Sequence, residues 1–507
     1  NQNSKILING DLTLQGNTYF KDITFMIPAS STYRTIYANG YNLTIGEEKK
    51  NTNVKVISED GKYPYIYGGS NSRDITGNTN IIINSGSFQS VYGGSKSKNI
   101  TGDTNLTIKY ATIINSVYGG SYGATINGNT NINIYGGIYG TGIQDATVMS
   151  VAGGSDNTGV IKKNSNLYVE NAKIVNGSIG GAGTTSTVEN TVNTIIKNIS
   201  LGLNNDGTNS IYGAAYRGGN TGSKQVNFEV DNIKGKPEYI IGYSNISGGA
   251  ASGTVRMNLK NINSENTQIY GGSYKCTATN NVSLVANMEN VKVKLLSAGG
   301  SVQNKIYKYD ISINNGCKFY DSLYLGISTE KQTNVATSSN VLKVTNLGNE
   351  NNIQSVNIKN QGAAITLNNS YLLAKENMSQ SAITLNNSNM NIEGLYGNLS
   401  GVNIDQNSLL TINKAKNLNI NGNINGRGTI KLEDNSNIMV KGKVIGNINI
   451  DISEEKTKSF KERSIWLSNK IDEINQLKLC CEPKNYNETI ERLKAIANDL
   501  KTCNSIN

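Results

Sequence analysis

The side chains best suited to ligand chemistry are tyrosines at the same position of a repeated pattern, each followed by glycine: Tyr67, Tyr92, Tyr118, Tyr212 and Tyr270. Rings at the same position of stacked repeats form a ladder. A ladder that faces solvent offers a flat aromatic strip on which sugar rings can lie, whereas one that faces inward belongs to the core. These tyrosines are therefore candidate ligand-binding residues, and packing across a tight glycine corner is the competing interpretation.

The amino-acid composition restricts the catalytic chemistry that is possible. The chain has no histidine, which excludes Ser-His and Cys-His nucleophilic sites and zinc sites that contain histidine. Glycoside hydrolysis needs clustered carboxylates, but the acidic residues here are dispersed. We interpret them as turn residues, at Asp74, Asp103, Asp156, Asp206, Asp231 and Asp310. We therefore expect no catalytic residue, no metal and no cofactor.

A repeated stretch must position these side chains. The segment 75–83 returns at 100–108, 126–134 and 161–169, and such a period is typical of a repeat architecture. Its short, β-branched, alternating apolar run predicts a strand. We expect glycines before the strand and at the Gly-Gly corner to supply positive φ.

No single repeat can bury its own apolar face, so the repeats must stack as parallel strands ~4.8 Å apart. The sequence thus predicts an all-β fold, a right-handed parallel β-helix (β-solenoid), with Ile81, Leu106 and Ile132 in one buried column. The same phase predicts an internal ladder of side-chain amides at Asn80, Asn105, Asn131 and Asn166.

Changes of pattern suggest a division of the chain. We expect N-terminal strands and a cap at 1–62, a Gly-Gly-repeat β-helix at 63–335, and its continuation with shorter repeats at 336–452. Longer intervals between Gly-Gly corners should form loops that carry binding, at Gly136 to Met149, Leu201 to Ser210 and Lys234 to Ser244.

The segment 453–507 has apolar residues at helical spacing, interrupted by Pro483. It predicts a C-terminal helical hairpin. The hairpin either covers the last repeat or, through sparse heptad spacing typical of a coiled coil, docks on another copy to form a homo-oligomer.

Five cysteines are dispersed along the chain: Cys276, Cys317, Cys480, Cys481 and Cys503. The first two we interpret as buried small apolar residues. Antiparallel helices would hold Cys503 ~20 Å from the pair at the hairpin bend. A disulfide there needs a bent or shorter hairpin, or a second chain.

The formal charge of +10 suggests an anionic partner such as an acidic polysaccharide, wall polymer or membrane surface, although solubility explains it equally well. The sequence starts within a strand pattern and without Met, so we interpret it as a mature or trimmed secreted chain. It has no apolar run of membrane-spanning length.

The phrase Val-Tyr-Gly-Gly-Ser followed by Gly-Asn-Thr-Asn and an alternating strand, as at 92–108 and 118–134, resembles the Gly-Gly repeats of large surface-exposed or secreted proteins of low-GC Gram-positive bacteria. The wider fold is similar to pectin-lyase-like right-handed β-helices. The resemblance covers about residues 60 to 330 and implies an extracellular, adhesin-like protein. The Leu-Pro-x-Thr-Gly sorting motif typical of wall-attached proteins is not in the sequence.

The sequence therefore predicts a secreted or cell-surface protein that binds a glycan, wall polymer or host surface, with no nucleic-acid partner. One alternative is a polysaccharide lyase or hydrolase on the same scaffold. Another is a structural subunit that stacks end to end, or a toxin or phage-type receptor-binding shaft.

Overall fold

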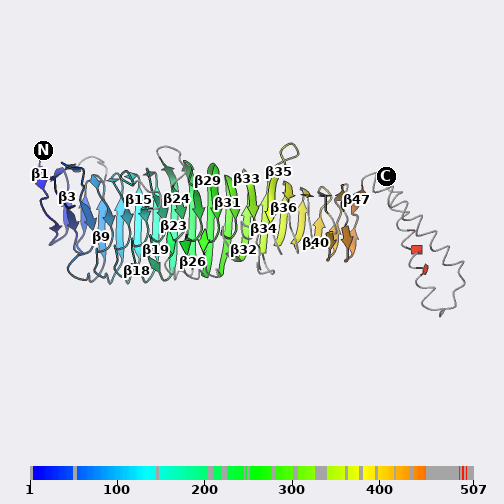
Figure 1. Cartoon of the computed structure of the whole chain (residues 1–507), viewed down its shortest axis with the longest axis horizontal. Coiled ribbons are helices and arrows are strands. Elements are labelled where there is room, and N and C mark those ends of the chain that lie inside the picture. Colours follow the sequence, from blue (N-terminus) through cyan, green and yellow to red (C-terminus); the bar gives the residue numbers. More distant parts are fainter. Residues whose placement is uncertain are drawn as a thin grey trace.

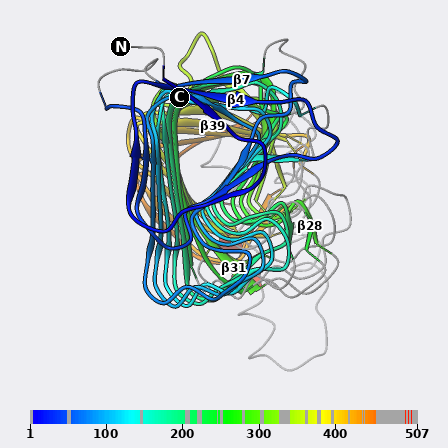
Figure 2. The same ribbon diagram turned by 90° about the vertical axis from the view of Figure 1, so that its left-hand side faces the viewer.

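The computed structural model is an elongated stack of parallel strands (Figure 1). It describes residues 4–48, 54–143, 148–202, 209–218, 225–244, 246–247, 252–276, 281–300, 306–325, 340–359, 363–375, 381–393, 398–415, 418–433, 436, 438–452, 490–491, 494–495 and 498. Seen along its length, successive repeats superimpose around a common outline (Figure 2).

Most strands pair with the equivalent strand of the next repeat, and so form columns along the stack. The first column contains β3 (Thr18–Phe20), β6 (Leu43–Ile45), β9 (Thr79–Ile83), β12 (Thr104–Ile108), β15 (Thr130–Tyr135), β19 (Ser165–Glu170), β23 (Thr191–Leu201), β26 (Gln225–Lys234), β29 (Ser252–Tyr270), β31 (Asn281–Ser297), β32 (Ile306–Ile313), β34 (Asn340–Thr345), β36 (Ala363–Asn368), β38 (Ser381–Asn386), β40 (Asn398–Ile404), β42 (Leu418–Ile420), β43 (Ile424–Gly426), β45 (Ile438–Val440) and β46 (Val444–Gly446).

A second column is short because its strands merge into the long strand β23. It contains β10 (Ser87–Phe88), β13 (Thr112–Ile113), β16 (Ile138–Tyr139) and β20 (Lys173–Ile174).

The third column runs beside the Gly-Gly corners and carries the predicted tyrosines. It contains β2 (Leu12–Thr13), β5 (Thr35–Tyr37), β8 (Tyr65–Tyr67), β11 (Val91–Tyr92), β14 (Val117–Tyr118), β17 (Met149–Ala152), β21 (Ser178–Gly180), β24 (Ser210–Tyr212), β27 (Tyr239–Ile241), β33 (Lys318–Tyr324), β35 (Gln354–Lys359), β37 (Tyr371–Lys375), β39 (Asn389–Glu393), β41 (Leu409–Asn413), β44 (Thr429–Leu432) and β47 (Asn449–Ile452). The C-terminal parts of β29 and β31 continue this column.

Three smaller sheets complete the described strands. They are β1 (Ser4–Leu7) with β4 (Ile23–Ile27) and β7 (Val54–Ser58), β18 (Val160–Ile161) with β22 (Thr187–Val188), and β25 (Arg217–Gly218) with β28 (Ile246–Ser247) and β30 (Lys275–Cys276).

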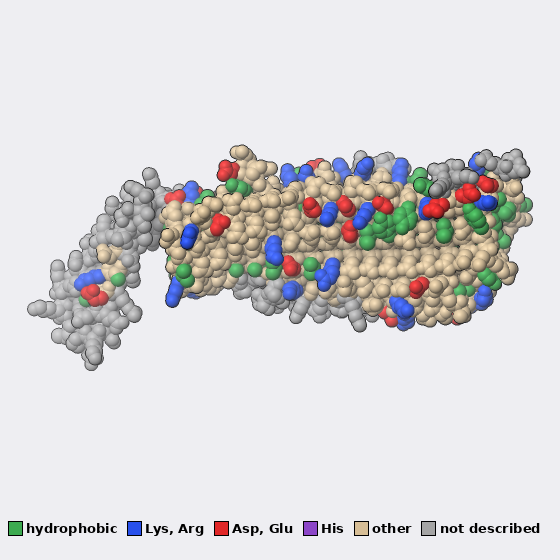
Figure 3. All heavy atoms as spheres, turned by 180° about the vertical axis from the view of Figure 1, so that it is seen from behind, with side chains coloured by type: hydrophobic (Ala, Val, Ile, Leu, Met, Phe, Trp, Pro, Cys, Tyr) green, Lys and Arg blue, Asp and Glu red, His purple; other side chains and the backbone are tan. Residues whose placement is uncertain are grey.

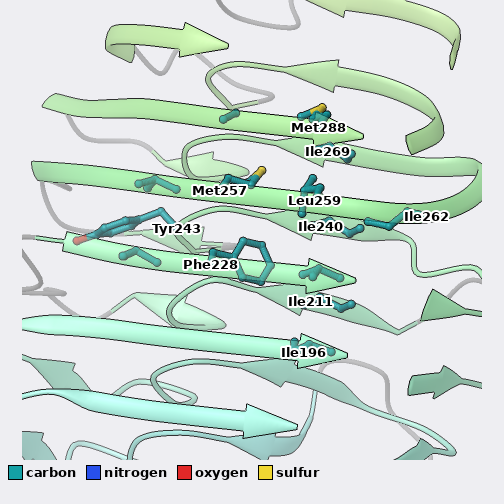
Figure 4. Packing of buried hydrophobic residues seen from close by; sticks show 14 of the residues in the cluster. Ile196, Ile211, Phe228, Ile240, Tyr243, Met257, Leu259, Ile262, Ile269 and Met288 are labelled. Carbon is teal, nitrogen blue, oxygen red and sulfur yellow. The ribbon is translucent and has the colours of Figure 1, made fainter. Parts of the chain in front are cut away.

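The predicted register is confirmed at its central point. Leu106 pairs with Ile81 on one side and with Ile132 on the other, and all three are buried. Figure 4 shows the same stacking farther along the core, where labelled residues of neighbouring strands lie over one another: Ile211, Ile240 and Ile269. An all-β chain with parallel sheets is thus confirmed, and the arrangement is compatible with the predicted β-helix.

Glycine occurs at the Gly-Gly corner for a different physical reason from the one expected. Its glycines do not have positive φ in the described repeats. Before the strand, the prediction holds at Gly77 but is wrong at the equivalent Gly102 and Gly128. A Cβ on Gly93 would lie 2.4 Å from the carbonyl oxygen of Gly119. Glycine is needed here because successive corners pack backbone against backbone, so the prediction of positive φ was wrong at this corner.

The amide ladder is confirmed and longer than predicted, but it is half-buried and not internal. Each Nδ2 donates to the Oδ1 of the previous repeat, at 2.6 to 3.0 Å, through Asn42, Asn80, Asn105, Asn131, Asn166, Asn193 and Asn227. It lies on the first column, on the face opposite to the buried Ile81, Leu106 and Ile132 side chains.

The predicted helical hairpin at 453–507 lies outside the described residues except for five helical positions between 490 and 498. Cys480, Cys481 and Cys503 lie outside them too, and Cys317 is a buried free thiol. No helix in the described part of the chain has both the length and the apolarity needed to cross a membrane.

Candidate functional site

Four tyrosines stack along the third column in the first part of the chain. Ring centroids are 5.6 Å apart from Tyr37 to Tyr67, 4.6 Å from Tyr67 to Tyr92 and 5.2 Å from Tyr92 to Tyr118, with interplanar angles of 20°, 8° and 15°. These rings are buried. The ladder that the sequence predicts therefore exists, and its ring faces cover one another.

The ladder does not continue through all five predicted tyrosines. In register after Tyr118 come Ala152 and Gly180, and only then Tyr212. Ile241 separates Tyr212 from Tyr270. Tyr212 and Tyr270 are buried, and each packs against a different neighbouring tyrosine, Tyr216 and Tyr274 respectively.

An open pocket of about 680 Å³ lies beside the end of the stacked rings. Tyr92 and Tyr118 line it, together with Tyr65, Tyr122 and Tyr216. Tyr67 is not among its lining residues, and lies behind Tyr92 in the stack. Of the five predicted residues, the structure thus brings two into one pocket.

Asp156 supplies the charge of this pocket. Tyr92 Oη donates to its Oδ2 at 3.2 Å, and Thr184 Oγ1 donates to its Oδ1 at 3.2 Å. The hydroxyls of Tyr118 and Thr184 lie 3.3 Å apart. The group of Tyr92, Tyr118, Thr184 and Asp156, which we call the tyrosine-aspartate cluster, joins four successive repeats of the stack.

Local backbone contacts fix the position of Asp156. It follows the Gly-Gly-Ser corner after β17, and its N–H donates to the carbonyl oxygen of Ser121 in the previous repeat. Its own carbonyl oxygen accepts from the N–H of Thr185. The carboxylate is therefore held in place by the same backbone stacking that forms the corner.

Burial raises the pKa of the Asp156 carboxyl, while hydrogen bonds from Tyr118, Tyr92 and Thr184 act in the opposite direction. Burial, and then the nearby Asp156 charge, also raise the pKa of the Tyr92 and Tyr118 phenols. These phenols are therefore neutral donors at ordinary pH, and the carboxylate is the acceptor. Such a mixture of aromatic rings and hydrogen-bonding groups suits a polyhydroxylated ligand.

The loop predicted at Gly136 to Met149 contributes to this pocket. Gly142, Ile143, Val148 and Met149 line it, and residues 144–147 lie outside the described part. The loop predicted at Leu201 to Ser210 is described only at its ends. The long interval at Gly136 was thus a usable signal for the pocket.

Asp156 was missed as a site residue. The sequence suggests a turn residue at this position. That interpretation suits Asp74 and Asp103, since their Oδ1 atoms accept backbone N–H groups of the next repeat, but it is wrong for Asp231 and Asp310, which lie within strands β26 and β32. Asp156 has neighbours from separate repeats instead. No other carboxyl lines the described part of this pocket, and the described residues contain no group of three possible metal ligands.

Comparison with known proteins gives no match to a family, to a curated protein or to a solved structure.

Proposed function

We propose that this chain is a right-handed parallel β-helix of a secreted or cell-surface protein, and that it binds a glycan in the pocket at the tyrosine-aspartate cluster. The single observation that carries the proposal is this cluster, in which phenols, a hydroxyl and a half-buried carboxylate from four repeats meet beside an open pocket. The register of the strands supports the β-helix.

Among the described aromatic residues that line this pocket, Tyr122 is the most exposed. Its side chain is 44% exposed, and its ring meets that of Tyr92 edge to face at 6.4 Å. A sugar ring can stack on the exposed ring while its hydroxyls donate to the Asp156 carboxylate. We therefore assign the aromatic platform to the exposed Tyr122 and not to the buried tyrosine ladder.

The lyase or hydrolase alternative has less support at this site. Hydrolysis of a glycosidic bond by the common routes uses two carboxyl groups, and the described lining of the pocket supplies one, Asp156. If the glycan were cleaved, a catalytic function would therefore replace the proposed binding function.

A glycan array probed with the purified chain and two variants tests the proposal. Tyr122→Ala should weaken binding about tenfold or more, because stacking on an aromatic ring is lost. Tyr110→Ala is the matched control, since Tyr110 is 50% exposed and does not line the pocket. Equal binding by both variants would contradict the proposed site.

A further inference from the structure

Along one row on the outer face of the first column, side chains that are in register on neighbouring strands alternate in charge. In register, Lys197 is followed by Asp231, then Lys260, then Glu289. Lys260 Nζ lies 3.6 Å from Glu289 Oε2, and Lys197 Nζ lies 2.9 Å from Glu229 Oε1. On the face drawn in Figure 3, cationic and anionic side chains likewise lie beside one another over a mostly uncharged surface.

Between β31 and β33, by contrast, one pair brings like charges together. Lys292 of β31 is in direct register with Lys318 of β33. Like charges that face each other across neighbouring strands destabilise a sheet. Within the described residues, neither lysine forms an ion pair. Glu289, three residues before Lys292 on β31, pairs with Lys260.

Both lysines line a second open pocket of about 410 Å³, far along the stack from the tyrosine-aspartate cluster. Tyr320, which is 45% exposed, lies on the same face of β33, and Lys318 Nζ is 4.5 Å from its ring centroid. Side-chain amides complete the lining at Asn346, Asn349, Asn352 and Gln354.

We propose that this second pocket binds an anionic saccharide, whose acidic group lies between the Lys292 and Lys318 ammonium groups. An anion at this point removes the repulsion that the register creates, and two point charges from adjacent strands suit a carboxylate or a sulfate. Tyr320 and the amides argue for a sugar and not a bare ion, because they offer a ring face and groups that match hydroxyls. The site is separate from the tyrosine-aspartate cluster.

Binding of three soluble probes separates the possible ligands: polygalacturonate oligomers carry carboxylates, dextran sulfate carries sulfates, and dextran is neutral. We expect Lys292→Gln and Lys318→Gln each to weaken binding of at least one anionic probe about tenfold. Each variant should also flatten the dependence of binding on salt. The probe that loses most affinity identifies the acidic group.

Lys197→Gln is the matched control, because it removes a lysine that the protein itself neutralises. It should leave anion binding within about twofold. Without ligand, Lys318→Gln should unfold at the same or a higher temperature than the original chain, because a repulsion is removed. This second readout separates loss of the site from loss of folding.

Equal binding of dextran and the anionic probes, or undiminished binding by Lys292→Gln and Lys318→Gln, would overturn the proposal. The result is independent of the tyrosine pocket, since Tyr122→Ala should not change anion binding here. Failure of one site can therefore be distinguished from failure of the other.

Discussion

At the scale of single residues, chemistry and folding make different demands on neighbouring positions of one corner. Gly153 and Gly154 are needed because a Cβ on either would collide with the backbone of the next repeat. Asp156, just past this corner, receives hydrogen bonds from a phenol and a hydroxyl. The corner thus provides the rigid support, and the residue after it provides the polar group.

Asp156→Asn tests the carboxylate. The amide keeps the size of the side chain but loses the negative charge, so glycan binding should fall about tenfold. Asp74→Asn is the control, because Asp74 acts as a backbone acceptor outside the pocket. Isothermal titration of both variants measures the difference, and equal losses would argue against a specific role for Asp156.

The pH dependence of binding follows from the same carboxylate. Burial raises the pKa of Asp156 above its ordinary value of 3.8. The charged acceptor is present above the raised pKa and is lost as pH falls through it. Binding should therefore weaken on acidification with a midpoint above 3.8, and Asp156→Asn should abolish this step. A titration of affinity against pH would contradict the assignment if both proteins behaved alike.

Gly93→Ala tests why the corner requires glycine. The added Cβ would lie 2.4 Å from the Gly119 carbonyl oxygen, so the free energy of unfolding should fall by about 1–3 kcal/mol. Gly123→Ala is the control, because nothing lies within 4 Å of its added Cβ. Denaturant unfolding measures both, and a neutral Gly93→Ala would show that the corners are not in close contact.

At the scale of elements, the amide ladder is a property of the first column and not of any one strand. An inner member such as Asn131 donates to Asn105 and accepts from Asn166. Asn42 is the end member, and its one hydrogen bond within this ladder is the one that it accepts from Asn80. The contribution of a side chain should therefore depend on its place along the column.

Asn131→Ala should cost about twice as much stability as Asn42→Ala. Each lost hydrogen bond lowers the free energy of unfolding by about 0.5–1.5 kcal/mol, and the inner position loses two. Chemical denaturation compares the two variants directly. Equal and small effects would mean that water replaces the ladder without cost.

Sequence patterns were sufficient for the strands and for their register. The repeated stretch fixes which residues share a phase, so the pairing of Ile81, Leu106 and Ile132 could be predicted. The pocket could not be predicted, because Tyr92, Tyr118 and Asp156 meet through different repeats and an irregular insertion. The period of the repeats does not indicate which insertion lies beside which corner.

At the scale of the whole molecule, the stack is built from contacts between neighbouring repeats. Strands β34, β36 and β38 pair one after another, with Ile365 in direct register with Ile383. Stability in such an architecture is approximately a sum of repeat and nearest-neighbour terms. Losing one complete repeat should therefore shorten the stack without destroying it.

Deletion of residues 365–382 tests this, because it joins Ala364 to Ile383 and preserves the register of the remaining strands. We expect folded protein with retained β-sheet circular dichroism and unchanged glycan binding in the distant tyrosine pocket. Deletion of 365–381 is the control: it joins Ala364 to Ala382 and leaves one extra residue, so the buried Ile383 and Leu385 side chains shift toward the solvent face. Unfolding of both deletions alike would contradict independent stacking of repeats.

The most direct test of the account is to incubate the full chain with the glycan identified on the array, and to measure both its retention and the length of the glycan afterwards. We predict that the original chain retains the glycan without shortening it, and that Asp156→Asn and Tyr122→Ala each lose this retention. Shortened glycan, or retention that both variants preserve in full, would contradict the claim that this stack of repeats binds a glycan at the tyrosine-aspartate cluster.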